Sequence, residues 1–357
     1  MNRCCIFWLL VFFTACRAPA SSSPSVPKVA GGASPSPGGG AGAVARASLP
    51  LVLLTDTPLP GPAVRFDYED LDVAKGHLVI AHMNDASVIV VKSSDGSLVK
   101  VLPGIPRARG VVVADEVGRI FVTSSPNKLV IIDNDSLALV ARVDTGHSPD
   151  GVGWDPIHKI VGVSDQGDGA ISLISDAGSG TRRPIRLGAE TGNVVFDPSR
   201  KMFWITVVQS SPPDQLIAVD PVMAQVARRI ELPGCDGAHG LRIHPDGNSA
   251  LVACEGNSKV ARVDLDANHA LELAPSGRSP DVLAIDPGLD WLYVAAESGD
   301  LKVFDLSRSG LVNIDTERVA PASHSVAVDA ATHRVFFPLL AGPNGTPVLR
   351  IMRPAGT

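Results

Sequence analysis

The sequence predicts an all-β fold, a seven-bladed β-propeller with four antiparallel strands in each blade. From residue 49 onward one pattern recurs: a short apolar run that ends in Asp or His, a turn rich in Pro and Gly, and a second apolar run. A constant period with several short strands in each unit is typical of propeller blades. The recurring residues are 40 to 47 positions apart and stand at Asp72, Asp115, Asp155, Asp197, His244, Asp286 and Asp329.

The fifth repeat shows the content of one unit. It contains four apolar runs, at 240–243, 249–253, 260–264 and 270–273. Pro245, Asp246 and Gly247 separate the first two runs and predict a hairpin turn, because Pro presets its own φ and Gly tolerates a positive φ. No segment shows sustained helical periodicity, which excludes a parallel βαβ architecture.

The two ends of the repeat region predict how the ring closes. The last repeat, from His324, supplies three strands and lacks an outermost one. The apolar run 49–54 precedes the first full repeat, and its sequence LVLLTDTPLPGP is similar to the outer strand and exit loop LVKVLPGIPRA at 98–108. We therefore expect the N-terminal strand to complete the seventh blade and so remove an open sheet edge.

The N-terminal segment indicates export. Arg3 and an apolar run at 6–13 predict a signal peptide over residues 1–15 that is too short to span a bilayer. Phe13-Thr14-Ala15-Cys16 resembles a bacterial lipobox, which would leave Cys16 as a lipidated N-terminus; a plain signal peptide cut near Ala20 is the alternative. The protein is then expected in the periplasm or at the cell surface, touching the membrane only through this anchor.

Residues 16–48 are rich in Ala, Ser, Pro and Gly, which predicts a flexible tether before a propeller over residues 49–357. Cys235 and Cys254 are then the two cysteines left in the mature domain, and an oxidising compartment favours a disulfide between them over two separate thiols. The formal net charge of −6 and the lack of Lys/Arg runs argue against a nucleic-acid partner.

The repeat segments GHSPDGVGWDP (146–156), GLRIHPDGNSALVAC (240–254), NSKVARVDL (257–265) and SPDVLAIDPGLDWLYVAAE (279–297) resemble the YVTN/YncE-like β-propellers of exported bacterial proteins. The resemblance covers about residues 49–354 and implies the same fold and compartment. It implies no shared catalytic motif, and fold by itself does not determine chemistry.

The residues at the entry of each blade form the candidate site. Propellers bind ligands mainly on the face where one blade's outer strand leads into the next blade's inner strand. The residue five positions before each recurring Asp or His stands at this entry. In blade order these residues are Asp67, Gly110, Asp150, Gly192, His239, Asp281 and His324.

Four of these entry residues predict a metal site. His239, Asp281, His324 and Asp67 belong to neighbouring blades once the ring closes, and imidazole with carboxylate is a common ligand set for divalent ions. A polar ligand site without metal, or simple turn capping by these side chains, remains an alternative.

Further loop residues are candidates for ligand binding beside Asp150. Arg107, His147 and Arg278 lie three positions before entry residues and could orient a carboxylate or phosphate. Glu255 and Glu297 follow second strands and could line the rim. Solvated loop charge is the alternative for both groups.

The chain has no nucleophile motif, haem-attachment motif or nucleotide-binding loop. A binding or scaffolding module of the cell envelope is therefore the expected function, with a small ligand or an envelope protein as partner. A metal-dependent hydrolase or lactonase, with Glu255 or Glu297 as base, and a metal-binding redox protein are the alternatives.

Overall fold

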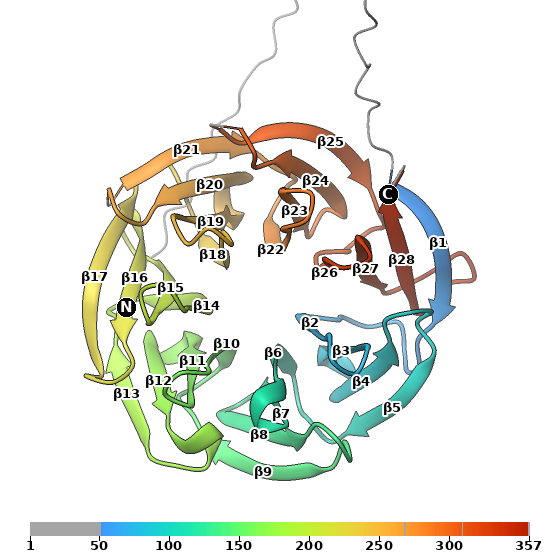
Figure 1. Cartoon of the computed structure of the whole chain (residues 1–357), viewed down its shortest axis with the longest axis horizontal. Coiled ribbons are helices and arrows are strands. Elements are labelled where there is room, and N and C mark those ends of the chain that lie inside the picture. Colours follow the sequence, from blue (N-terminus) through green and yellow to red (C-terminus); the bar gives the residue numbers. More distant parts are fainter. Residues whose placement is uncertain (1–50, 268, 309, 356–357) are drawn as a thin grey trace, which may run out of the picture. The chain divides into compact units, whose positions relative to one another are not determined.

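The computed structural model describes residues 51–267, 269–308 and 310–355. Seven four-stranded antiparallel sheets surround a central axis (Figure 1). The predicted fold class is confirmed. The expected signal peptide, the lipidation site at Cys16 and the tether over 16–48 lie outside the described residues. Within the described ranges, no helix has the length and apolar character that a membrane crossing requires.

The strands follow the chain order blade by blade. Blade I contains β2 (Glu69–Asp72), β3 (His77–His82), β4 (Ser87–Lys92) and β5 (Leu98–Pro103). Blade II contains β6 (Ala108–Ala114), β7 (Arg119–Ser124), β8 (Lys128–Asp133) and β9 (Leu139–Asp144). Blade III contains β10 (Pro149–Asp155), β11 (Ile160–Asp165), β12 (Ala170–Ile174) and β13 (Arg182–Arg186). Blade IV contains β14 (Glu190–Asp197), β15 (Met202–Val208), β16 (Asp214–Asp220) and β17 (Gln225–Leu232).

The remaining blades complete the ring. Blade V contains β18 (Ala238–Ile243), β19 (Ser249–Cys254), β20 (Lys259–Asp264) and β21 (His269–Pro275). Blade VI contains β22 (Pro280–Asp286), β23 (Trp291–Ala296), β24 (Asp300–Asp305) and β25 (Val312–Arg318). Blade VII contains β26 (Ala327–Asp329), β27 (Arg334–Leu339), β28 (Val348–Pro354) and, as its outermost strand, β1 (Leu51–Pro58).

The N-terminal strand closes the ring as expected. β1 pairs antiparallel with β28 from Leu51↔Pro354 to Pro58↔Val348. Arg350 holds this pairing with two bonds to the Asp56 carboxylate, at 2.8 and 2.7 Å. The first and last described strands thus pair in one sheet (Figure 1), and β1 covers the edge that β28 would otherwise present.

The recurring Asp explains the first hairpin of the repeat. Asp155 Oδ1 accepts the backbone N–H groups of Ile157 and His158, at 2.9 and 3.1 Å. Asp286 makes the same pair of bonds to Gly288 and Leu289. These carboxylates satisfy turn amides that have no strand partner, which is why Asp recurs at the end of the innermost strand.

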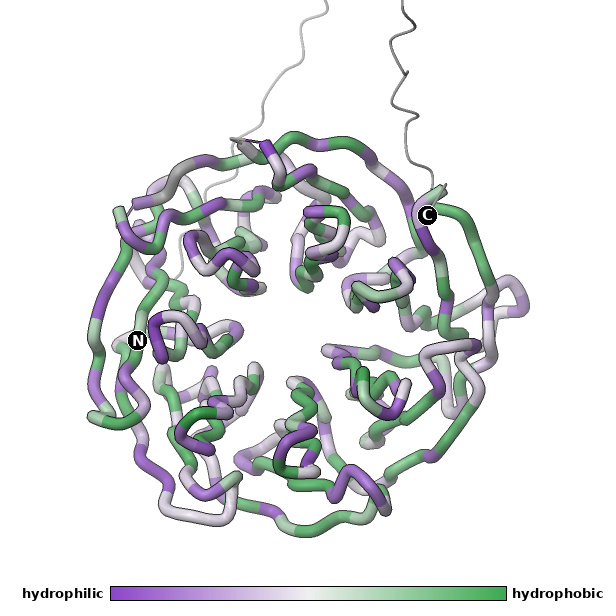
Figure 2. The backbone as a smooth tube through the Cα atoms, viewed as in Figure 1, coloured by the Kyte–Doolittle hydropathy of each residue, from purple (hydrophilic) through white to green (hydrophobic). Residues whose placement is uncertain are grey.

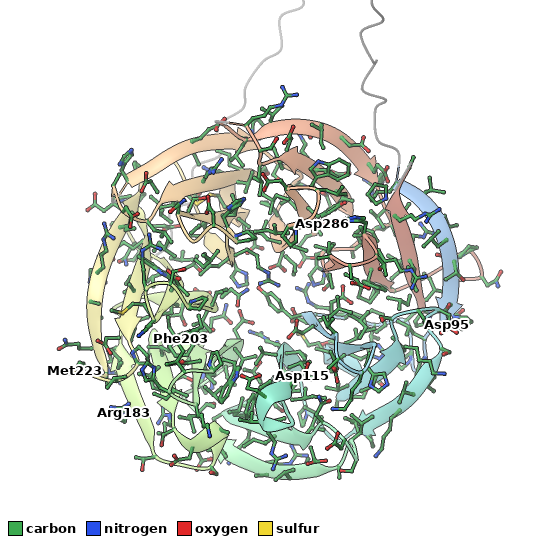
Figure 3. The ribbon with its side chains drawn as sticks, viewed as in Figure 1. Asp95, Asp115, Arg183, Phe203, Met223 and Asp286 are labelled. Atoms are coloured by element: carbon green, nitrogen blue, oxygen red, sulfur yellow. A yellow bond between two sulfur atoms is a disulfide. The ribbon has the colours of Figure 1, made fainter. Side chains whose placement is uncertain are left out.

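The apolar core lies between neighbouring blades. The middle strands are buried on both faces, whereas outer strands such as β9 and β17 alternate exposed and covered residues. Figure 2 shows this as mixed colour along the periphery. Figure 3 places Phe203, which is fully buried, inside the ring and Met223 at its edge.

The two cysteines of the described residues are joined in this structure. Cys235, in the link between β17 and β18, forms a disulfide with Cys254 at the end of β19, and the Cα atoms are 5.2 Å apart. Both residues are buried in the apolar cluster of blades IV and V. The disulfide therefore ties the entry of blade V to its second strand.

Candidate functional site

The strand registers define one equivalent entry position in every blade. β6 pairs Val111 with Val122 after a bulge, and β10 pairs Val152 with Val163 after the same bulge. Arg109 and Asp150 each lie two residues before these valines, so they occupy equivalent positions in their blades. The same alignment in the other blades gives the ring Asp67, Arg109, Asp150, Gly192, His239, Asp281 and His324.

The expected entry residue of blade II was wrong by one position. β6 ends at Ala114, so Asp115 lies one residue beyond the end of the inner strand and begins a short 3-10 helix. The count from Asp115 therefore reached Gly110, whereas the residue at the channel mouth is Arg109. The entry residue of blade II is thus the cationic Arg109 and not Gly110, which was expected.

Six of the predicted site residues line one cavity at the channel mouth. Its volume is about 270 Å³. Arg65, Met83, Arg109 and Gln166 join them there. The six predicted residues are Asp67, Asp150, His239, Glu255, Asp281 and Glu297. The mouth of the channel is therefore a concave and strongly polar site.

His239 bridges two carboxylates across the mouth. Its Nδ1 lies 3.1 Å from Asp281 Oδ1, and its Nε2 lies 3.2 Å from Asp150 Oδ2. Burial alone would lower the pKa of His239, but the close contacts with the carboxylates of Asp150 and Asp281 outweigh it and hold the pKa well above its usual value. The raised pKa favours the protonated ring, and His239 connects blades III, V and VI through its two contacts.

This bridge changes the expected metal set. Both ring nitrogens of His239 already face carboxylate oxygens, at 3.2 and 3.1 Å. In the described part of the chain, the His, Cys, Asp and Glu side chains with ligand atoms all within 4.8 Å of one another are Asp281, Glu297 and His324. The group that the structure brings together thus differs from the four residues expected from sequence. It contains Asp281 and His324, as expected, but Glu297 in place of His239 and Asp67.

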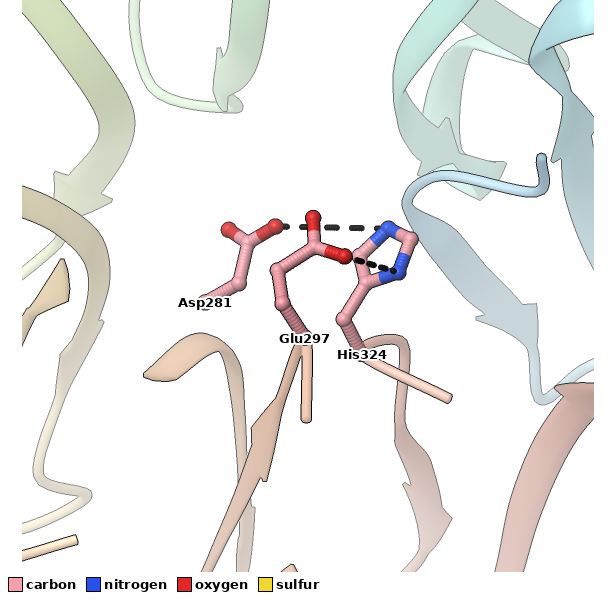
Figure 4. Close-up of side chains that lie close together, drawn as sticks. All are labelled: Asp281, Glu297 and His324. Atoms are coloured by element: carbon pink, nitrogen blue, oxygen red, sulfur yellow. Dashed lines mark ion pairs between the residues drawn. The ribbon is translucent and has the colours of Figure 1, made fainter. Parts of the chain in front are cut away.

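Figure 4 shows the three grouped side chains facing one another. His324 Nε2 lies 4.0 Å from Asp281 Oδ2, and its Nδ1 lies 3.6 Å from Glu297 Oε2. Arg65 reaches the same carboxylates, with Nη1 2.6 Å from Glu297 Oε1 and Nη2 3.7 Å from Asp281 Oδ2. Although burial raises the pKa of Asp281, the bond to His239 and the nearby cations lower it to about 2.

Two carboxylates of the cavity, those of Asp67 and Glu255, are not bonded to a cationic side chain. Among the described residues, no side chain makes a hydrogen bond or a close ion pair with the carboxylate of Asp67 or Glu255, although Ser325 Oγ donates to the backbone oxygen of Asp67. Burial, followed by the charge of Asp150, raises the pKa of Asp67 to about 7. Burial and the charge of Asp281 also raise the pKa of Glu255. In both cases burial is the larger cause of the raised pKa, and the negative charge of a neighbouring carboxylate is the second.

Three predicted ligand-binding residues lie elsewhere. Arg107, His147 and Arg278 are exposed on the loops that lead into blades II, III and VI, and none lines the cavity. His147 is held by its own backbone N–H, which donates to Asp168 Oδ2 at 3.0 Å. The two arginines that line the cavity are Arg65 and Arg109, not Arg107 and Arg278 as expected.

Sequence reasoning missed both of these arginines for identifiable reasons. Arg109 was one residue from the position that was counted, and a correct end for β6 would have found it. Arg65 lies in the connection from β1 to β2, where no repeat equivalent marks it. Gln166 also lines the cavity, at the position after a second strand that Glu255 and Glu297 occupy in their own blades.

Comparisons with known proteins support the fold. No family model and no curated protein matches the chain, so the YVTN/YncE-like resemblance stays a prediction. The hydrazine synthase of Kuenenia stuttgartiensis matches with a TM-score of 0.70 and 16% identity, over 85% of this chain and 98% of that one. The chain is a seven-bladed β-propeller.

A second solved propeller leads to the same conclusion. Selenomethionine-substituted virginiamycin B lyase from Staphylococcus aureus matches with a TM-score of 0.68 and 12% identity, over 85% of this chain and 99% of that one. At these identities the likeness establishes the fold alone.

Proposed function

We propose that this protein is a binding module that holds a small cationic ligand in the mouth of its central channel. The supporting observation is the charge imbalance of the cavity. Three cations, Arg65, Arg109 and the bridged His239, face a larger number of acidic groups. The five carboxylates are Asp67, Asp150, Glu255, Asp281 and Glu297.

The carboxylates that are not bonded to Arg or His side chains indicate which kind of ligand the cavity suits. Asp150, Asp281 and Glu297 already accept bonds from the three cations. Asp67 and Glu255 retain free acceptor atoms, which suit an ammonium or guanidinium group with several N–H donors. The volume of about 270 Å³ is near the lower end for ligand pockets, which suits a small molecule.

The sequence of residues 1–48 favours a location outside the cytoplasm for this binding module. An exported and lipid-anchored propeller would present its mouth to small solutes of the cell envelope. Its flexible tether would separate the propeller from the membrane surface.

Calorimetric titration of the untagged protein tests this function. We expect n-butylamine and guanidinium to bind, and their neutral counterparts n-butanol and urea not to bind. Asp67→Asn should weaken cation binding by about tenfold or more, because a charge-assisted hydrogen bond contributes about 1.5–3 kcal/mol. Asp135→Asn, which makes the same change at an exposed residue paired with Lys75, should leave binding unchanged.

Two outcomes would reject the binding function. The first is equal binding of the cations and of n-butanol and urea, which would show that the positive charge of the ligand is not recognised. The second is that neither n-butylamine nor guanidinium binds at millimolar concentration. Binding that weakens equally in Asp67→Asn and Asp135→Asn would place the ligand outside the mouth.

A metal-dependent enzyme, either a hydrolase or lactonase, or a metal-binding redox protein, is the second candidate. The grouping of Asp281, Glu297 and His324 favours it. The two solved propellers carry the names of a synthase and a lyase, although their low identity supports only the fold. Elemental analysis of untagged protein dialysed against metal-free buffer separates this candidate from the first.

A further inference from the structure

We infer that Asp281, Glu297 and His324 form a site for a divalent transition-metal ion, and that Arg65 closes this site when the ion is absent. The inference deepens the second candidate function of the channel mouth. It is independent of the organic cation of the first, because Asp67 and Glu255 take no part in it.

The backbone holds the three ligands in place. Glu297 follows β23, and its N–H donates to Ser279 O at 2.8 Å, just before β22 begins. Val282 N–H, next to Asp281, donates to His324 O at 3.3 Å. The ligand-bearing segments of blades VI and VII are therefore joined to each other. Ligands held by rigid elements lose little conformational freedom when an ion binds.

His324 is a buried imidazole whose Nε2 is directed at this group. It is only 3% exposed, and its Nε2 has no hydrogen-bond partner among the described residues. Its Nδ1 lies 3.3 Å from Ala322 O, which favours the tautomer with the proton on Nδ1. A metal-binding histidine characteristically donates its second ring N–H to a carbonyl or carboxylate in this way. The Nε2 lone pair then faces Asp281.

The separation of the two facing atoms suits an ion. His324 Nε2 and Asp281 Oδ2 are 4.0 Å apart, which is too long for a hydrogen bond. Two ligands bonded to one ion at about 2.0–2.2 Å can lie up to about 4.4 Å apart. One imidazole with two carboxylates suits Mn²⁺, Fe²⁺, Co²⁺ or Zn²⁺. Asp281 and Glu297 also line the cavity, so open coordination positions would face it.

Arg65 competes with the ion for the carboxylates. Its guanidinium contacts Glu297 Oε1 at 2.6 Å and approaches Asp281 Oδ2 at 3.7 Å. Arg65 lies in the connection between β1 and β2 rather than in a strand, and about a third of its side chain is exposed. The guanidinium can therefore swing outward when an ion neutralises the same charges. Removal of this cation should make the site easier to fill.

Titration of the untagged, chelator-treated protein with Mn²⁺, Co²⁺ and Zn²⁺ tests the inference, with no amine present. We expect one ion per chain. Glu297→Gln should weaken its binding by about tenfold or more, and Arg65→Met should strengthen it by about tenfold or more. Glu190→Gln, the same change at an exposed rim residue outside the cavity lining, should have no effect. The visible absorption of bound Co²⁺ should lose its imidazole contribution in His324→Gln.

The inference is overturned if neither the wild type nor Arg65→Met binds any of the three ions. Equal weakening in Glu297→Gln and Glu190→Gln would also overturn it, because the effect would then be general surface charge. If ions bind while n-butylamine does not, the metal site stands and the organic-cation function fails. The reverse result rejects the metal site alone.

Discussion

His239 Nε2 lies 3.2 Å from Asp150 Oδ2, although blade IV separates these two residues around the ring. Gly192 is the entry residue of blade IV and makes this contact possible. A Cβ at Gly192 would lie 2.9 Å from His239 Cα and 2.6 Å from Thr206 Oγ1. The missing side chain therefore lets His239 approach blade III and bridge Asp150 to Asp281.

Gly192→Ala should break this bridge and destabilise the fold. The added methyl group forces His239 or Thr206 to shift, and overpacking of this kind costs about 1–3 kcal/mol. Urea unfolding measures the loss, and NMR titration of the His239 ring should show its raised pKa falling. An unchanged free energy of unfolding with an unchanged ring pKa would contradict the role of Gly192.

The N-terminal strand should carry much of the stability of the ring. A chain that begins at residue 47 keeps β1, whereas one that begins at residue 59 exposes the edge of β28 and loses the bond pair from Arg350 to Asp56. We expect thermal unfolding near the wild-type temperature for the first and a large drop for the second. Equal melting of both truncations would contradict closure by β1.

The disulfide should stabilise the entry of blade V. Cys235 and Cys254 are 19 residues apart, and closing a loop of this length is worth about 3 kcal/mol in the chain-entropy treatment. Non-reducing mass analysis should find the two cysteines linked, and Cys235→Ala combined with Cys254→Ala should lower the free energy of unfolding. Two freely alkylated thiols in protein purified under oxidising conditions would refute this prediction.

Glu69 should destabilise the fold at neutral pH. It occupies the position that is Val or Leu in every other blade: Val111, Val152, Val194, Leu241, Leu283 and Val326. Val111 and Val152 pack against the preceding blade there. Glu69 is buried, and neither of its carboxylate oxygens has a hydrogen-bond partner among the described residues, so burial raises its pKa well above the ordinary 4.5.

The sign of this shift sets the pH dependence. A raised pKa in the folded state gives a stabilising contribution below pH 4.5, which is lost as the pH rises toward the folded-state pKa. Glu69→Val should therefore raise the free energy of unfolding at pH 7.5 more than at pH 4, by a difference on the order of 1–3 kcal/mol. Urea unfolding at both pH values measures it. Glu69→Gln is the matched control: it should share the pH effect without the packing gain, and an equal effect at both pH values would contradict the argument.

Much of the fold is readable from sequence because the repeat is local. Each blade recurs with its Asp-capped hairpin, so Asp155, Asp197 and Asp286 mark the ends of inner strands before any contact between blades is known. The spare strand at the N-terminus likewise predicts closure, because an unpaired sheet edge has to be covered. The local pattern also places His239, Asp281 and His324 at one level of the channel.

Only the tertiary structure decides how those residues work together. β6 ends at Ala114, one residue before Asp115, so Arg109 rather than Gly110 takes the entry position, and one residue of register changes which side chain faces the channel. Arg65 meets Glu297 from 232 residues away, through a connection that has no repeat equivalent. Whether His239 is a metal ligand or a bridging cation depends on the carboxylates within hydrogen-bond distance of its two nitrogens, and those distances exist only once seven blades have closed into a ring.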